Sequence, residues 1–374
     1  MADLLSHYFA QSGFLALSWE NLVMFLIAAV LLYLAVAKDA EPLLLIPISF
    51  GIVMANIPPQ VTGIFEPGTG LLWIIQQGLV LGIYPPLIFL GIGAVTDFSF
   101  VLANPKTLFL GAAAQIGIFI TFIAANAFGF SLLDAASIAI IGGADGPTSI
   151  YVASIFKSQY LPIIAIASYS YIALIPVLQP PIMRLLTTKK ERAIKMGRQL
   201  RKVSKLERMV FPVVSTIAIS LIVPQALPLV GMLMLGNLLR ENGRTKRLVE
   251  AAGKYVSDTV IILLCVSVGA KADGKVFLTL ESIMVMGLGC AAFIVATGSG
   301  ILFAKLMNVF SKNKVNPLIG AAGVSAVPTA ARVAQRVASE EDSTNFILMH
   351  AMGPNIAGVI GSAVAAGVFL SIIK

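Results

Sequence analysis

One carboxylate interrupts a strongly apolar stretch of this chain. Asp145 lies in the sequence GGADGPTS, residues 142–149, with apolar runs on both sides. A carboxylate at membrane depth is costly unless a counter-charge or a ligand pairs with it. The residue and its setting therefore predict a cation or proton site. The simpler alternative is that Asp145 only caps a short helix.

A second interruption has the same character. Residues 320–329 read GAAGVSAVPT, so small residues again break an apolar run and a proline, Pro328, follows. Proline suits the first turn of a new helix, because its missing N–H would have had no partner there. We expect each interruption to separate two half-helices that meet within the membrane, where a polar cavity makes broken helices tolerable.

Oxygen-bearing side chains accompany these breaks. Asn316 precedes the second break, Ser325 lies inside it, and Asn355 ends the sequence MGPN at residues 352–355. Carboxylate, amide and hydroxyl oxygens suit sodium better than a soft metal. Sodium and a proton would then compete for one site at Asp145. The alternative for the three smaller polar residues is hydrogen bonding between helices.

Two further residues are candidates for chemistry. Arg332 follows the second break by one turn and could hold a carboxylate substrate, or pair with an acid such as Asp145. Tyr171 could donate a proton, or could belong to an aromatic belt at the membrane surface.

The composition fixes the class of protein that must position these residues. Of the 374 residues, 58% are hydrophobic and 12% are charged, whereas soluble domains carry roughly 25% charged residues. We therefore expect an all-α polytopic protein of the cell membrane. At about 20 residues per span, the length allows about ten spans with some re-entrant pieces. Nothing in the sequence indicates nucleic-acid binding.

A basic segment divides the chain. Residues 187–208 hold nine Lys or Arg and two Glu, which places this linker in the cytoplasm, against lipid headgroups. It separates a first half, 22–186, from a second half, 209–374, and an N-terminal segment, 1–21, precedes both.

The two halves resemble each other. The sequence GAVTD at 93–97 matches GAKAD at 269–273, and further matches in the same order are Phe50-Gly51 with Leu235-Gly236 and Pro147-Thr148 with Pro328-Thr329. Equivalent loops exchange their basic character, so we expect an inverted-topology repeat with the site at its interface, near the bilayer midplane.

Several separated motifs resemble one family, the beta subunits of biotin-dependent, sodium-pumping decarboxylases. The resemblance runs from residue 41 to the C-terminus and rests on the segments 142–148, 316–320, 323–328 and 353–355. It implies a subunit that decarboxylates carboxybiotin, consumes a proton and drives Na⁺ outward. It also implies an elevator-type fold, with a scaffold and a mobile core that holds both breaks.

The resemblance implies roles for particular residues and partners. The sodium ligands would be Asp145, Asn316, Ser325 and Asn355, with Gly320 allowing close approach. Tyr171 and Arg332 would be functional, Arg332 toward carboxybiotin. The implied partners are a carboxyltransferase alpha subunit, a biotin carrier subunit and a small gamma or delta membrane subunit, in a complex with a homotrimer of this chain.

Two features of the sequence narrow this interpretation, and one alternative function stays open. The biotin-attachment lysine of carrier domains lies between two methionines, whereas Lys195-Met196 follows Ile194, so we expect no biotin on this chain. The compact length favours the acyl-CoA branches over the oxaloacetate branch. The alternative function is a sodium- or proton-coupled carrier for a carboxylate; a channel fits two opposed broken helices less well.

Overall fold

The computed structural model describes residues 12–39, 41–58, 62–197, 201–272, 274–277, 279–311 and 313–373, without the side chains of residues 275 and 276. Within these ranges the regular elements are helices and no strand is present, which confirms the predicted all-α class. Asp273 of the second repeat motif, residues 1–11 of the N-terminal segment and residues 198–200 of the linker lie outside the described part.

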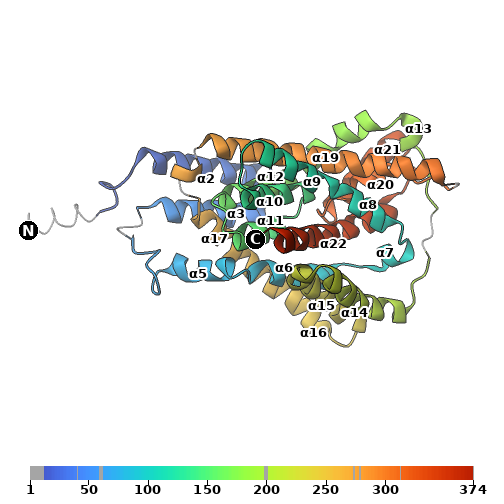
Figure 1. The fold of residues 1–374 in the computed structure, drawn as a ribbon, viewed down its shortest axis with the longest axis horizontal. Coiled ribbons are helices and arrows are strands. Elements are labelled where there is room, and N and C mark those ends of the chain that lie inside the picture. The colour runs from blue at the N-terminus through green and yellow to red at the C-terminus, as the bar shows by residue number, and fades with distance from the viewer. Residues whose placement is uncertain are drawn as a thin grey trace, which may run out of the picture.

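Long apolar helices dominate the architecture (Figure 1). In the described part of the chain, six are long and apolar enough to cross a membrane, by length and composition, and a bent pair of helices would make a seventh. The six are α2 (Trp19–Ala37), α8 with α9 (Thr107–Ala114 and Ile116–Ala127), α12 (Leu161–Leu186), α16 to α17 (Lys246–Ala270), α19 (Leu280–Phe310) and α22 (Leu348–Ile372). The bent pair is α5 (Leu71–Val80) and α6 (Tyr84–Val95), at 66°.

Fewer of the described helices are long enough to span a membrane than the roughly ten expected, because several helices are short. A full span needs about 20 residues, and α3 (Pro42–Asn56), α15 (Leu227–Asn242) and the helices at the breaks are shorter than that. The remaining elements are α7 (Ser99–Ala103), α10 (Leu132–Ala139), η1 (Ile140–Gly143), α11 (Gly146–Ile155), α13 (Lys189–Arg192), α14 (Lys205–Ile222), η2 (Pro224–Ala226), α18 (Gly274–Phe277), α20 (Leu318–Ala321) and α21 (Thr329–Glu341).

Two close helix crossings join the halves. Gly93 of α6 packs against the backbone of α15, where Gly236 packs back against α6; Gly51 of α3 and Gly269 of α17 pack in the same way. A side chain at any of these four positions would collide with a carbonyl of the facing helix. Residues matched by sequence therefore occupy matching places in two crossings between opposite halves. This arrangement supports the predicted duplication.

Both predicted breaks are confirmed. The first runs from η1 through Ala144, in the left-handed region at φ 52°, to Asp145 at the N-cap of α11. The second lies between α20 and α21, with Pro328 just before α21. The two breaks are in direct contact, because the backbone N–H of Ser325 donates to the carbonyl of Gly143 at 2.9 Å. The fold thus brings together segments that are far apart in sequence.

We expect Gly93→Ala to destabilise the protein by roughly 1–3 kcal/mol, because its methyl group would overlap the carbonyl of Leu233 and force the crossing apart. Thermal unfolding in detergent measures the effect. Gly287→Ala is the matched control, since a methyl group on this exposed helical glycine meets no atom within 4 Å. Equal unfolding temperatures for the two variants would contradict the close crossing.

Candidate cation site

Asp145 is buried, with 5% of its surface exposed, and both its oxygens have partners. Oδ1 accepts a hydrogen bond from the backbone N–H of Thr148 at 3.1 Å, so Asp145 does cap α11. Oδ2 accepts a hydrogen bond from the Ser362 hydroxyl of α22 at 2.5 Å. Among the described residues, no Lys or Arg forms an ion pair with it. The carboxylate therefore sits at the breaks without a protein counter-charge.

A chain of hydroxyls links the two breaks through α22. Ser325 donates to the Ser362 oxygen at 3.0 Å, and Ser362 donates in turn to Asp145. Ser362 is fully buried and Ser325 is 8% exposed. The structure thus brings the predicted residue Ser325 to Asp145 through Ser362, which the sequence analysis missed.

Three buried amides stabilise the unwound carbonyls of the second break. Gln179 of α12 donates to Ala321 O at 3.0 Å and Asn355 of α22 donates to Val324 O at 2.6 Å. Gln115, between α8 and α9, lies 3.5 Å from Gly323 O as a donor. An amide has a carbonyl oxygen on its other arm, and these three oxygens are buried with no donor among the described residues.

Several of these acceptors gather where the breaks meet. Asn355 contacts the carbonyls on both sides of Ser325. The Gln115 oxygen lies beside the first break, 3.4 Å from the position that a Cβ on Gly143 would take. The Thr148 hydroxyl, one turn after Asp145, is also buried without a partner. Buried acceptors without donors are rare in proteins, and a hard cation would satisfy them together with the carboxylate.

Two residues predicted to bind Na⁺, Asn316 and Gly320, make other contacts in the structure. The Asn316 amide donates to the carbonyls of Arg192 and Ile194 at 2.7 and 3.0 Å, and its oxygen accepts from Leu318 N. Gly320 packs directly against Gly300 of α19. The side chain of Asn316 thus fastens the linker to the second break, and Gly320 lets α19 approach it.

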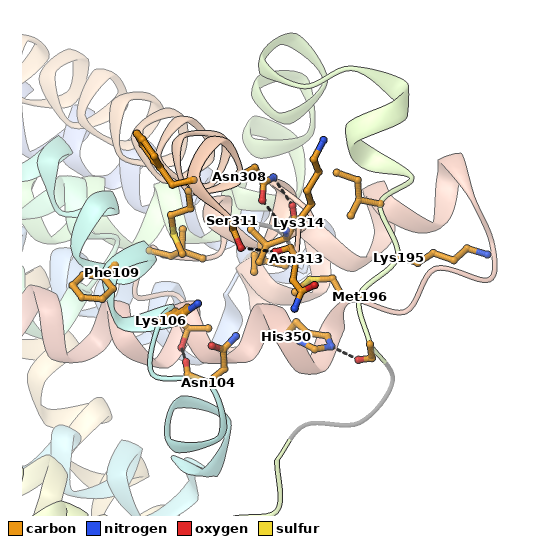
Figure 2. Close-up of a pocket in the computed structure, with 18 residues that line it drawn as sticks. Asn104, Lys106, Phe109, Lys195, Met196, Asn308, Ser311, Asn313, Lys314 and His350 are labelled. Carbon is orange, nitrogen blue, oxygen red and sulfur yellow. Dashed lines mark hydrogen bonds between the residues drawn. The ribbon is translucent and has the colours of Figure 1, made fainter.

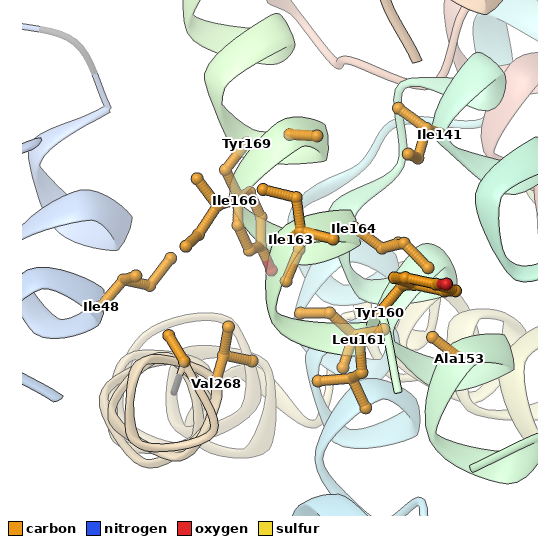
Figure 3. Packing of buried hydrophobic residues seen from close by; sticks show 14 of the residues in the cluster. Ile48, Ile141, Ala153, Tyr160, Leu161, Ile163, Ile164, Ile166, Tyr169 and Val268 are labelled. Carbon is orange, nitrogen blue, oxygen red and sulfur yellow. The ribbon is translucent and has the colours of Figure 1, made fainter. Parts of the chain in front are cut away.

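The two neighbouring tyrosines of α12 have different environments. The Tyr171 hydroxyl donates to Met286 O of α19 at 2.6 Å. The ring of Tyr169 instead packs against Gly146, next to Asp145, so closely that a Cβ there would overlap it. Figure 3 shows Tyr169 among apolar side chains of α12, with Val268 of α17 nearby. The sequence analysis singled out Tyr171 and missed Tyr169.

Arg332 is exposed on α21 and forms no ion pair with any described acidic residue. The alternative that pairs it with Asp145 is therefore wrong in this structure. One turn later, Arg336 donates to Pro176 O at 2.7 Å. That carbonyl needs a donor, because Pro180 has no N–H to close the helical hydrogen bond.

Ion pairs hold the linker against the end of α21. Arg192 contacts Glu341 at 2.6 Å and Lys195 contacts Asp342 at 3.0 Å. The pKa of the Asp342 carboxyl is lowered to about 2, because the hydroxyl of Thr344 and the amine of Lys195 hydrogen-bond to its ionised form. The linker is thereby fixed to the segment that follows the second break.

The comparisons with known proteins agree with one another. The family model for the Na⁺-transporting oxaloacetate decarboxylase beta subunit matches residues 20–373. The methylmalonyl-CoA decarboxylase subunit beta of Propionigenium modestum is 53% identical over the whole of both chains. The glutaconyl-CoA decarboxylase subunit beta of Acidaminococcus fermentans is 53% identical, over 97% of this chain and 96% of its own. A probable oxaloacetate decarboxylase beta chain of Vibrio cholerae is 46% identical, over 96% of each chain.

We expect Asp342→Asn to loosen the linker and to speed trypsin cleavage within residues 187–208. A lowered pKa means that the stabilisation is fully present above the ordinary value of 3.8 and is lost as the pH falls toward 2. The difference between the variant and the unsubstituted protein should therefore be constant above about pH 5. Asp258→Asn, at an exposed position on α17, is the control. Identical cleavage rates for both variants would contradict the clamp.

Proposed function

Because the chain belongs to the family of Na⁺-transporting oxaloacetate decarboxylase beta subunits, we propose that it decarboxylates carboxybiotin and couples this reaction to outward Na⁺ transport. It is a multi-pass membrane protein with several spanning helices. The observation that carries the proposal is Asp145, a buried carboxylate that lies where two broken helices meet and forms no ion pair with any described Lys or Arg. Na⁺ is the transported substrate at this site.

The proposed ion site combines predicted and newly found residues. Asp145, Ser325 and Asn355 were expected from the sequence, and the structure adds Ser362, Gln115 and Thr148 around them. Their oxygens are hard donors, which suit Na⁺. In this proposal Asn316 and Gly320 position the second break, and their direct ligation of Na⁺ stays a prediction.

Burial decides how the ion and a proton exchange. A buried carboxylate in this setting either has its charge balanced by Na⁺ or takes up a proton and becomes neutral. The hydroxyl chain from Ser325 through Ser362 gives Asp145 a hydrogen-bonded connection to the second break. We propose that Na⁺ leaves this site outward and that a proton replaces it.

The chemical step consumes that proton. In carboxybiotin the bond between the ureido nitrogen and the carboxylate carbon breaks, CO2 leaves, and the electron pair on nitrogen takes up one proton. We propose Arg332 as a contact for the carboxylate and Tyr171 as a proton donor. Arg332 is exposed and forms no ion pair with a described acidic residue, which supports its role. The Tyr171 hydroxyl must first leave Met286 O.

The relatives point to partners and a substrate branch. They are named as subunits, so we propose a complex with a carboxyltransferase alpha subunit, a biotin carrier and a small gamma or delta membrane subunit. We also propose a homotrimer of this chain, with a scaffold and a mobile core that holds both breaks, one from each of the halves 22–186 and 209–374. The two acyl-CoA relatives are 53% identical and the oxaloacetate relative 46%, which supports the acyl-CoA branch.

Inside-out vesicles that hold the reconstituted complex should take up Na⁺ when the acyl-CoA or oxaloacetate substrate is added. Avidin should stop this uptake, because it sequesters the biotin that carries the carboxyl group. Uptake of ²²Na⁺ with and without avidin measures this. Uptake that ignores avidin would instead identify a sodium-coupled carrier for a carboxylate.

Substitutions at the ion site should change the Na⁺ dependence of decarboxylation. Asp145→Asn should abolish Na⁺-dependent decarboxylation, because no carboxylate remains to balance the ion. Ser362→Ala should raise the Na⁺ concentration for half-maximal rate about tenfold, since one hydrogen bond to a charged group is lost. Ser371→Ala, an exposed serine on the same helix, is the matched control and should not change it. Normal Na⁺ dependence in Asp145→Asn would overturn the site.

A further inference from the structure

The long helix α12 contains three internal prolines, Pro176, Pro180 and Pro181. Because proline has no N–H, each of them leaves the carbonyl four residues earlier without its helical donor. These carbonyls belong to Ile172, Pro176 and Val177. A backbone carbonyl of this kind in a spanning helix needs a donor from a neighbouring segment. The prolines therefore give α12 acceptors at fixed places along its length.

Among the described residues, the carbonyl of Pro176 is the one of these three to which a side chain donates. The donor is the guanidinium of Arg336 on α21, at 2.7 Å. Arg336 is exposed and forms no ion pair with a described acidic residue. Its guanidinium is thus committed to the backbone of α12, although an arginine more often binds a carboxylate or a phosphate.

The contact joins two helices that run in the same direction. Arg336 of α21 meets Pro176 of α12, and farther along both helices Glu340 of α21 pairs with Arg184 of α12 at 2.5 Å. Between these contacts the apolar side chains of α12 and α21 pack in one buried cluster. A given step along one helix therefore corresponds to a similar step along the other.

One turn back along both helices lie the two residues proposed for the chemical step. Four residues before Arg336 is Arg332, on the same face of α21, and four residues before Pro176 is Ile172, next to Tyr171. Because an α-helix rises about 1.5 Å per residue, the step is about 6 Å on each helix. The guanidinium of Arg332 therefore lies level with Tyr171, and it makes no hydrogen bond or ion pair with a described residue.

The described ion pairs of this part of the chain lie at the far end of α21. They join residues 340–342 to α12 and to the linker, and one of them is Lys195 with Asp342 at 3.0 Å. Figure 2 shows the amine of Lys195 directed away from the other labelled residues, which line the neighbouring cavity. Arg336 thus makes the described polar contact between α21 and α12 that lies closest to Arg332.

From these observations we propose that Arg336 is a positioning residue for the decarboxylation. Its contact with Pro176 O fixes the register of α21 along α12, so that a carboxylate held by Arg332 is aligned with the proton donor Tyr171. A misplacement of about 1 Å between reacting groups can lower a rate about 100-fold, so the register of the two helices bears directly on the chemical step. This role rests on the proposed function and adds to it a residue that touches neither Na⁺ nor the carboxylate.

Arg336→Gln in the intact complex should lower kcat with the carboxylated carrier protein by about tenfold or more, because the two groups are no longer aligned. KM should change by less than about threefold, since Arg332 still meets the carboxylate. The Na⁺ concentration for half-maximal rate should stay the same. Arg336→Lys keeps a donor for Pro176 O and should restore most of kcat. Arg184→Gln is the matched control, because it also removes an arginine between α12 and α21, but from a half-exposed ion pair at their far end.

The prolines allow the same contact to be removed without changing Arg336. Pro180→Ala supplies an N–H to Pro176 O within α12, which displaces Arg336, so kcat should fall to the Arg336→Gln value. Because both changes remove one contact, the double variant should be no slower than either single variant. Pro181→Ala is the matched control, since it makes the same change at Val177 O, where no described side chain donates. Alanine favours a helix more than proline does, so both variants should fold.

The outcomes separate this role from the proposed function. A kcat for Arg336→Gln within about twofold of the Arg184→Gln value overturns the positioning role, and so do additive losses in the double variant. A raised KM with kcat unchanged would mean that Arg336 binds the carboxylate itself, which also overturns it. A changed Na⁺ dependence would mean a general disturbance of the core and overturns it as well. A wild-type complex that does not decarboxylate the carboxylated carrier protein overturns the proposed function instead.

Discussion

The structure depends on one constraint: a buried carboxylate lies where two broken helices meet, and no described Lys or Arg forms an ion pair with it. Among the described residues, Asp145 receives hydrogen bonds from Thr148 N and from the Ser362 hydroxyl. Leaving an ionised group in this state is costly, so the surrounding segments must supply either a bound cation or a proton. The backbone hydrogen bond from Ser325 to Gly143 holds the two breaks together at this point. Binding of a cation at Asp145 would therefore depend on how the two breaks are held against each other.

Broken helices create the ligands as well as the need for them. An unwound carbonyl within the membrane requires a donor, and amides from three different helices provide one for the second break. Each amide that donates in this way directs its own oxygen elsewhere, and these oxygens remain buried without donors. Stabilising the backbone thus leaves a set of acceptors near the carboxylate. Hydroxyls, amides and one carboxylate together form an oxygen-rich environment of the kind that hard cations favour.

The same break connects the ion site to the linker side of the molecule. Asn316 ties the linker carbonyls to the segment before the break, and ion pairs tie the linker to the segment after α21.

The sequence by itself determined the membrane class, the helical fold and both breaks, with Asp145 at the first of them, and it predicts a cytoplasmic linker. Those features depend on local chemistry: apolar length, clustered charge, and the conformational preferences of glycine and proline next to a lone carboxylate. Only the tertiary structure decided which residues surround Asp145. Ser362 is 217 residues away from it in sequence, on an apolar helix whose serines look alike until packing orients them. Tyr169 and Tyr171 lie about 200° apart around α12, so one faces Gly146 and the other faces α19. Asn316 likewise has the right chemistry for a ligand, but the packing of the linker against it gives its amide another partner.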